Sequence, residues 1–191
     1  MQNSPHAIIT HRGTFVDPFQ PKMNTYHIRD IAHALARICR WNGHCREFYS
    51  VAQHCCRMYD AALDCETPYL RRRALLHDAS EAYLTDLPTP IKKAFPGYKT
   101  AEIALSVELY EFFGLSGIHP EYDGIVERLD KILAGVEAAQ LGLRPDLWIF
   151  GDADYALICR LAGDAPRNWT PEEAERHFLM RAEECGINIQ E

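Results

Sequence analysis

Apolar residues recur along most of the chain at the three- and four-residue spacing of an amphipathic helix, and strand-like alternation is nearly absent. This pattern predicts an all-α fold. Residues 1 to about 25 contain several prolines and follow no sustained period, so we expect loops or short pieces of strand there. A first helix should begin at Asp30, which can cap it, and break near Asn42-Gly43.

Two further helices carry most of the polar residues of interest. One should run from about Ser50 to Ala62. The next should start at Thr67-Pro68, because proline is tolerated at the first position of a helix. It should continue through His77 and end before the Leu-Pro-Thr-Pro segment at residues 87–90.

Four more helices are expected in the rest of the chain, over about residues 98–113, 120–141, 152–161 and 170–185, with a loop from Leu143 to Gly151. Thr170 opens the last helix with a capping-box sequence, Thr-Pro-Glu-Glu. The apolar residues predicted to face the core are Ile31, Leu35, Ile38, Val51, Cys55, Met58, Leu70, Ala74, Leu75, Ile103, Val107, Tyr110, Ile125, Leu129, Ile132, Leu133 and Val136.

The composition fits one domain over residues 1–191, since a chain with 47% hydrophobic residues and this length can bury a substantial core. The formal net charge of -7 argues against a protein that binds a nucleic-acid duplex, which would normally carry a basic stripe. It does not exclude a small phosphorylated substrate, because a bound dication can reverse the local charge.

The cysteine pattern and the hydropathy of the chain indicate in which cellular compartment the protein is expected. The 7 cysteines form no C-x-x-C pair, which favours reduced, mostly buried thiols. Cys55 and Cys56 follow His54 directly, but adjacent residues on a helix point in different directions and make a poor chelate. No stretch has the apolar length needed to span a bilayer, and no leader pattern is seen. We therefore expect a cytoplasmic protein without a membrane partner.

Four residues that could bind a divalent cation lie in apolar helical segments: His54, His77, Asp78 and Asp130. A buried charge is costly unless it is paired or bound to a metal, so this set predicts a metal site. Nitrogen and oxygen ligands suit Mn²⁺, Fe²⁺, Co²⁺ or Zn²⁺ better than Ca²⁺. Taken alone, His77-Asp78 could equally be a buried ion pair, and His54 an ordinary core or surface histidine.

Two carboxylates near this set have both a functional and an ordinary interpretation. Glu81 lies four residues after His77, on the same face of a continuous helix, where it could take a proton from a water at the cation. It could also be a solvated helix glutamate. Asp86 could simply end the helix.

The order His54, His77-Asp78, Asp130 resembles the H…HD…D signature of the HD-domain metal-dependent phosphohydrolases. The segments 77–81 (HDASE) and 86–90 (DLPTP) are similar to the branch that includes the bacterial 5′-deoxynucleotidases. Arg40-Trp41, ahead of the first histidine, also matches that branch. Segments 30–32 and 48–54 look like members encoded by phages and prophages, some of which hydrolyse deoxynucleoside triphosphates, notably dATP. The resemblance covers about residues 25–140.

The resemblance implies an HD-type helical bundle with one divalent ion (Mn²⁺, Co²⁺, Fe²⁺, Zn²⁺ or Mg²⁺) held by His54, His77, Asp78 and Asp130. It implies that Glu81 activates or positions the attacking water. Arg40 would bind phosphate, Trp41 would line the 2′ side of the sugar, and Asp86 would accept a hydrogen bond from the 3′-hydroxyl. The alternative for Arg40 and Trp41 is a helix C-terminal cation and a core indole.

The implied function is hydrolysis of deoxynucleotides, either monophosphates or, with further Mg²⁺, triphosphates. The alternative is a nucleotide-sensing or scaffold protein that binds without turnover, although such a protein would not need Glu81. The chain lacks the G-Y-P motif of cyclic-dinucleotide phosphodiesterases, and Ser80-Glu81 differs from the Glu-Asp pair of alarmone hydrolases. Cations for a triphosphate could come from a neighbouring subunit of an expected homo-oligomer or from Arg71, Arg72, Arg73, Lys92, Lys93 and Lys99.

Overall fold

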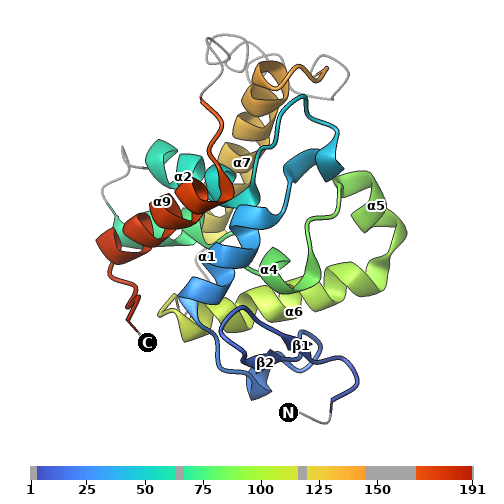
Figure 1. Ribbon diagram of the computed structural model, residues 1–191, viewed down its shortest axis with the longest axis vertical. Helices are drawn as coiled ribbons and strands as arrows, with labels where there is room; N and C mark the ends of the chain where they lie inside the picture. Colours follow the sequence, from blue (N-terminus) through green and yellow to red (C-terminus); the bar gives the residue numbers. More distant parts are fainter. Residues whose placement is uncertain (1–3, 63–66, 116–119, 145–166, 191) are drawn as a thin grey trace.

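The computed structural model describes residues 4–62, 67–115, 120–144 and 167–190 (Figure 1). Two short strands, β1 (Ile8–Ile9) and β2 (Phe15–Val16), pair antiparallel near the N-terminus. The other elements are helices, which confirms the prediction of an all-α fold. They are η1 (Pro21–Met23), α1 (Ile28–Arg37), η2 (Arg40–Gly43), α2 (Val51–Ala61), α3 (Pro68–Leu75), α4 (Glu81–Leu84), α5 (Thr89–Ala94), α6 (Pro96–Phe112), α7 (Pro120–Gln140) and α9 (Pro171–Glu184).

Helix α2 lies at the centre of the fold. Residues on every side of it are buried, including Val51, Cys55, Cys56 and Tyr59, and a helix of this kind must be covered by neighbours all round. Helices α1, α3 and α9 pack against α2, and α7 also contacts it. Figure 1 shows α9, from the far end of the chain, lying alongside α1. His54 is on α2 and is therefore deep in the molecule.

Several helix ends follow the predicted local chemistry. The Ser50 side chain accepts a hydrogen bond from the Gln53 N–H and caps α2. Thr170 forms the expected capping box at the start of α9. After α6, Gly114 has a φ of 74°, and this left-handed turn brings the Leu115 N–H to 2.7 Å from the Tyr110 carbonyl oxygen. Predicted limits for these helices are accurate to about two residues.

The first helix differs from its prediction. Helix α1 begins after His27, so Asp30 lies in its first turn and is not its cap. Asp30 is buried and accepts hydrogen bonds at 2.8 Å from the Thr10 hydroxyl and the Arg12 N–H, which fastens the N-terminal segment to α1. The helix also ends early, at Arg37, because Ile38 adopts an extended conformation that leads into a bridge between Cys39 and Ser50.

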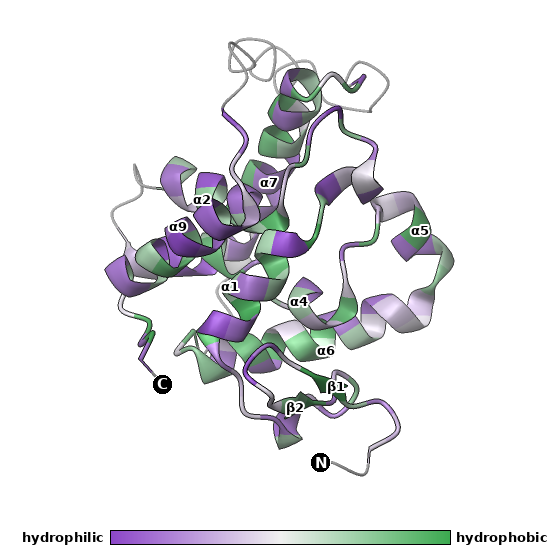
Figure 2. Ribbon diagram, in the orientation of Figure 1, coloured by the Kyte–Doolittle hydropathy of each residue, from purple (hydrophilic) through white to green (hydrophobic). Residues whose placement is uncertain are grey.

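Helix α6 buries a different face from the predicted one. Ile103 and Val107 are 53% and 51% exposed, whereas Leu105 and Leu109 are fully buried. Of the predicted face, Tyr110 is half-buried and packs against the core. Both the buried and the exposed side of this helix carry apolar residues, so the sequence pattern could not decide between the two faces. Figure 2 shows α6 coloured partly green along its length. Ile125 of α7, predicted to be buried, is likewise 44% exposed. The other predicted core residues of α7 are buried or half-buried.

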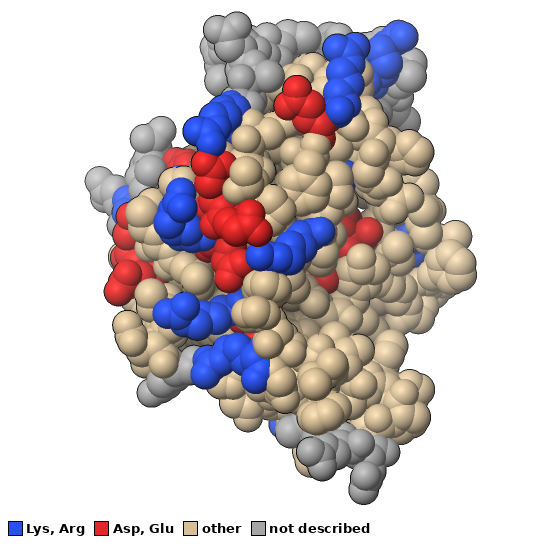
Figure 3. Space-filling model, in the orientation of Figure 1, with Lys and Arg blue, Asp and Glu red and all other residues tan. Residues whose placement is uncertain are grey.

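Charges are distributed unevenly over the surface. In the view of Figure 3, basic and acidic side chains alternate over α1 and α9, where Arg37 pairs with Glu172 and Glu175. The thiols of Cys39, Cys45, Cys55, Cys56 and Cys185 are free, as predicted, whereas Cys65 and Cys159 lie outside the described residues. The helix predicted at 152–161 also lies outside them. Within the described ranges, no helix combines the length and hydropathy that a membrane crossing requires.

Candidate metal centre and its adjoining clefts

His77 and Asp78 lie in a turn and not on a helix, which corrects the prediction of a continuous third helix. Helix α3 ends at Leu75, and the chain then turns by i+3 hydrogen bonds, from the Ala79 N–H to Leu76 and from the Glu81 N–H to Asp78, each 3.0 Å long. Glu81 begins α4. The turn lets the neighbouring side chains of His77 and Asp78 converge, with Nε2 and Oδ2 3.2 Å apart.

The structure brings the four predicted ligands together. The Nε2 atoms of His54 and His77 lie 3.2 Å apart. Asp130 Oδ1 is 3.0 Å from Nε2 of His54 and 3.8 Å from that of His77. Potential ligand atoms of His54, His77 and Asp78 all lie within 4.8 Å of one another, so this group could hold a metal ion. Asp130 adds a carboxylate from α7 beside both histidines.

The hydrogen bonds of the outer ring nitrogens determine what the inner ones can do. Nδ1 of His77 lies 2.8 Å from the carbonyl oxygen of Ala74, which can only accept, so this nitrogen carries a proton. Nδ1 of His54 lies 3.0 Å from both oxygens of the Glu137 carboxylate and donates to it. In a neutral ring Nε2 is then an acceptor. With both rings neutral, two nitrogen lone pairs would face each other beside two carboxylates, an arrangement that a metal cation or a proton would stabilise.

The electrostatics of the cluster also favour positive charge. Burial alone would lower the pKa of His77, yet the adjacent Asp78 carboxylate outweighs it and raises that pKa well above its usual range. Burial opposes ionisation of Asp78 too, but the charge of His77 keeps the pKa of Asp78 low. A proton and a divalent cation compete for the same nitrogen and oxygen atoms, so a site that raises the pKa of its histidines also attracts a metal.

Glu81 is buried near the cluster, at 3% exposure, and is not the solvated glutamate of the alternative interpretation. One carboxylate oxygen, Oε1, pairs with Lys92 Nζ at 3.0 Å, and the other, Oε2, is buried without a hydrogen-bond partner among the described residues. Burial raises the pKa of Glu81 well above its usual range, and the Asp78 and Asp86 carboxylates add to this shift. Glu81 can therefore exchange a proton closer to neutral pH than an exposed glutamate.

Two clefts meet at the cluster. One, of about 720 Å³, is lined by the residues assigned to phosphate and sugar (Arg40, Trp41 and Asp86), and the other, of about 940 Å³, extends along α6. Asp78, Asp130 and Lys92 line both. The cluster is therefore reachable from either cleft. The first cleft is lined in part by Arg40, Trp41, Asp78, Glu81, Asp86 and Lys93, and the second in part by Arg73, His77, Lys99, Ile103, Val107 and Tyr110.

Trp41 is held in the smaller cleft by an unusual backbone conformation. Trp41 and the next residue, Asn42, have φ values of 61° and 52°, in the left-handed region that costs a bulky residue about 1–2 kcal/mol. The segment is pinned where it meets α2, because the Arg40 N–H donates to the Tyr49 carbonyl at 2.9 Å. Such strain persists only where the surroundings fix the backbone, and it is common at functional sites.

Arg40 forms ion pairs with carboxylates of the cluster, which a surface arginine that binds phosphate would not need. Its Nη1 lies 3.4 Å from Asp78 Oδ2, and its Nε lies 3.5 Å from Glu137 Oε2. The alternative of a helix C-terminal cation does not fit, because α1 has ended before Arg40. Two other arginines that could bind a triphosphate are paired with protein groups. Arg72 donates to the carbonyl oxygens of Phe113 and Cys185. Arg73 pairs with Asp123 at 2.7 Å.

Two bacterial proteins are similar in sequence to this chain. No protein-family model matches it. It is 39% identical over 119 residues to YfdR, an uncharacterized protein of Escherichia coli K12, and spans 61% of the length of that protein. It is 32% identical over 184 residues, 89% of this chain and 93% of the relative, to the uncharacterized protein RCAP_rcc00048 of Rhodobacter capsulatus. The chain belongs to the RCAP_rcc00048 family.

In this member of the RCAP_rcc00048 family, the sequence interpretation missed Glu137. Its side chain is fully buried, and besides His54 it binds the Tyr49 hydroxyl at 2.5 Å and Arg57 Nη1 at 3.5 Å. Burial alone would raise the pKa of Glu137, but the charge of His54 outweighs it and lowers that pKa. One signal could have revealed the residue. Glu137 lies seven positions after Asp130, so both carboxylates share one face of an apolar helix.

Proposed function

We propose that this protein is a metal-dependent phosphohydrolase that acts on deoxynucleotides, either 5′-monophosphates or deoxynucleoside triphosphates. The observation that supports it most is the facing pair of Nε2 atoms of His54 and His77, 3.2 Å apart beside Asp78 and Asp130. With both rings neutral, these Nε2 atoms would face each other as acceptors, an arrangement that a metal cation or a proton would stabilise. The H…HD…D resemblance supplies the reaction class.

The residues present fit a divalent cation. The donor set is two imidazole nitrogens with carboxylate oxygens, which suits Mn²⁺, Co²⁺, Fe²⁺ or Zn²⁺ better than Mg²⁺, whose preferred ligands are oxygens. Each ligating histidine has its other nitrogen fixed by an acceptor, Glu137 or Ala74, as metal-binding histidines usually do. When bound, the ion supplies Lewis acidity at a phosphoryl group and to the attacking water.

The residues around the cluster have separate roles in this proposal. Glu81 accepts a proton from the attacking water through Oε2, the oxygen that Lys92 does not bind. Arg40 contacts phosphate from beside Asp78. Trp41 and Asp86 line the same cleft and select the sugar, the indole by excluding a 2′-hydroxyl and the carboxylate by accepting from the 3′-hydroxyl.

The experiment that tests the proposal is a product assay of the purified protein. Deoxynucleoside mono- and triphosphates of all four bases, with the matched ribonucleotides, are incubated with Mn²⁺, Co²⁺, Zn²⁺ and Mg²⁺ in turn. Release of phosphate, or of triphosphate, from deoxynucleotides identifies the scissile bond. His77→Ala protein, purified in the same way, controls for contaminating phosphatases. Saturable nucleotide binding without turnover under any metal would contradict the proposal and favour the sensing or scaffold alternative.

A further inference from the structure

Lys92 joins three helices through its ammonium group. It lies on α5, and its Nζ is 3.0 Å from Glu81 Oε1 on α4 and 2.5 Å from Glu102 Oε1 on α6. Lys99 Nζ pairs with the second oxygen of Glu102 at 3.0 Å. The side chains of Glu81 and Glu102 are 4% and 10% exposed, so both are largely out of water. Interactions between charges are stronger in such surroundings than at a surface.

The two oxygens of Glu81 are unequal as a result. Lys92 fixes Oε1, whereas Oε2 is buried and has no hydrogen-bond partner among the described residues. A buried carboxylate oxygen without a partner is costly, and such atoms are uncommon unless they have a function. Glu81 lines the smaller cleft with Asp78. The contact with Lys92 therefore leaves one defined oxygen for a proton.

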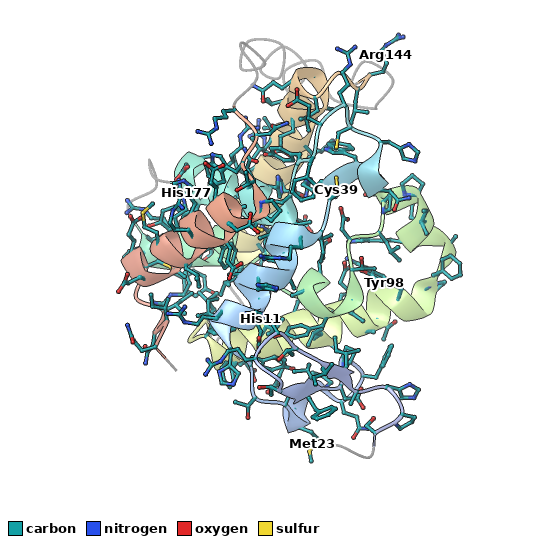
Figure 4. All side chains as sticks on the ribbon, viewed as in Figure 1. His11, Met23, Cys39, Tyr98, Arg144 and His177 are labelled. Carbon is teal, nitrogen blue, oxygen red and sulfur yellow. The ribbon has the colours of Figure 1, made fainter. Side chains whose placement is uncertain are left out.

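The neighbouring segments hold Lys92 in place. The Tyr98 hydroxyl, on the part of α6 labelled in Figure 4, donates to the Thr85 carbonyl at 2.6 Å. This bond ties the start of α6 to the residue that follows α4. The Tyr98 ring centre is 5.7 Å from Lys92 Nζ, within the range of a cation–π contact. Lys92 therefore sits between two carboxylates and an aromatic ring, and its charge is already neutralised by protein groups.

We infer that Lys92, anchored by Glu102, is a positioning residue that holds Glu81 by one oxygen and presents the other to the attacking water. Lys92 thus has a different role from the triphosphate-binding cation that the sequence suggested. The inference rests on the proposed function. It adds two residues that support catalysis, Lys92 on α5 and Glu102 on α6, to those at the turn of residues 76–80.

The test is a double-mutant cycle on the hydrolytic rate. Lys92→Met removes the charge at similar length, and we expect kcat to fall by about 10–10²-fold, the usual loss for a supporting partner, with KM and metal content little changed. Lys92→Arg should recover most of the loss. In a Glu81→Gln background, Lys92→Met should lower kcat no further, because residues that act as a unit are not additive. Glu102→Gln should give a smaller loss of the same kind.

Lys93→Met is the matched comparison, because this neighbour lines the same two clefts. We expect it to change KM and not kcat. Circular dichroism and metal analysis of each variant separate misfolding from mispositioning. A wild-type kcat in Lys92→Met, loss of its metal, or a full further loss in the Glu81→Gln background would each overturn the inference while leaving the proposed function intact. A wild-type protein that hydrolyses no substrate would overturn both.

Discussion

Glu137 binds Nδ1 of His54 at 3.0 Å through both carboxylate oxygens, and so directs the opposite ring nitrogen of His54 at Asp130 and His77. We predict that Glu137→Gln lowers metal affinity by about 10–10²-fold, as changes in such supporting groups do. The protein should also lose stability, because Arg40 and Arg57 lose a buried counter-charge. Calorimetric metal titration and thermal unfolding measure the two effects. Glu121→Gln, at an exposed residue in the first turn of α7, should change neither.

Loss of a ligand should remove the metal and the activity together. His77→Ala and Asp78→Ala are expected to be folded and helical, because both residues lie in a turn at the edge of the core. Elemental analysis of the purified variants checks the metal, and the product assay checks turnover. His6→Ala, at an exposed histidine, is the control. Wild-type metal content in either ligand variant would refute the assignment of the centre.

A variant at Glu81 should lose catalysis and still bind the metal. Glu81→Ala is expected to keep its metal and lose about 10²–10⁴-fold in kcat, the usual scale for a general acid or base. Its side chain contacts Lys92, and the ligand distances involve other residues. Single-turnover kinetics with matched metal loading provide the measurement. If this variant turns over at the wild-type rate, another group must accept the proton.

Sugar selectivity should depend on Trp41. In the proposed function Trp41 lines the 2′ side of the sugar, and a ribonucleotide would then place its 2′-hydroxyl against the indole without a partner. That arrangement costs about 1–3 kcal/mol, so deoxy substrates should be preferred by about one to two orders of magnitude in kcat/KM. Trp41→Ala should reduce this ratio chiefly by lowering the efficiency on deoxynucleotides. Phe95→Ala, at an aromatic residue that is 59% exposed, should leave the ratio unchanged. Equal wild-type efficiency on both sugars would remove Trp41 from the substrate site.

The two apolar faces of α6 should differ in their effect on stability. Leu105→Ala removes a fully buried side chain and should cost about 2–5 kcal/mol in the free energy of unfolding. Val107→Ala, at a position that is 51% exposed, should cost less than about 0.5 kcal/mol. Chemical denaturation compares them. Similar losses in both variants would mean that Val107 is covered in solution.

The helices were predictable where local chemistry determines their ends. Ser50, Thr170 and Gly114 mark helix limits by their own hydrogen bonds or backbone freedom, and these limits were predicted closely. The end of α3 was not, because Leu76 to Ser80 could continue a helix by propensity alone. The turn there is instead accompanied by contacts from distant parts of the chain, such as the hydrogen bond at 3.2 Å from the Tyr110 hydroxyl to the His77 carbonyl.

The residues of the candidate site also fall into a predictable and an unpredictable group. His54, His77, Asp78 and Asp130 could be selected because each is a polar residue in an apolar segment, and the structure brings them together. Glu137 and the Lys92–Glu81 pair depend on which faces of different helices meet, a relation that one sequence does not contain. The side chains that orient the candidate site are therefore harder to predict than the residues that could bind the metal.

The position of Asp130 and Glu137 on one helix has a consequence for folding. Both contact His54 of α2, so an ion at the cluster would link α7 directly to the middle of the core. Binding to the folded state alone would add RT ln(1 + [M]/Kd) to stability, about 2.7 kcal/mol at a hundredfold excess over Kd. Metal supply would then govern how often α7 detaches from the rest of the fold. The concentration of free metal in the cell would thereby influence the lifetime of the folded protein.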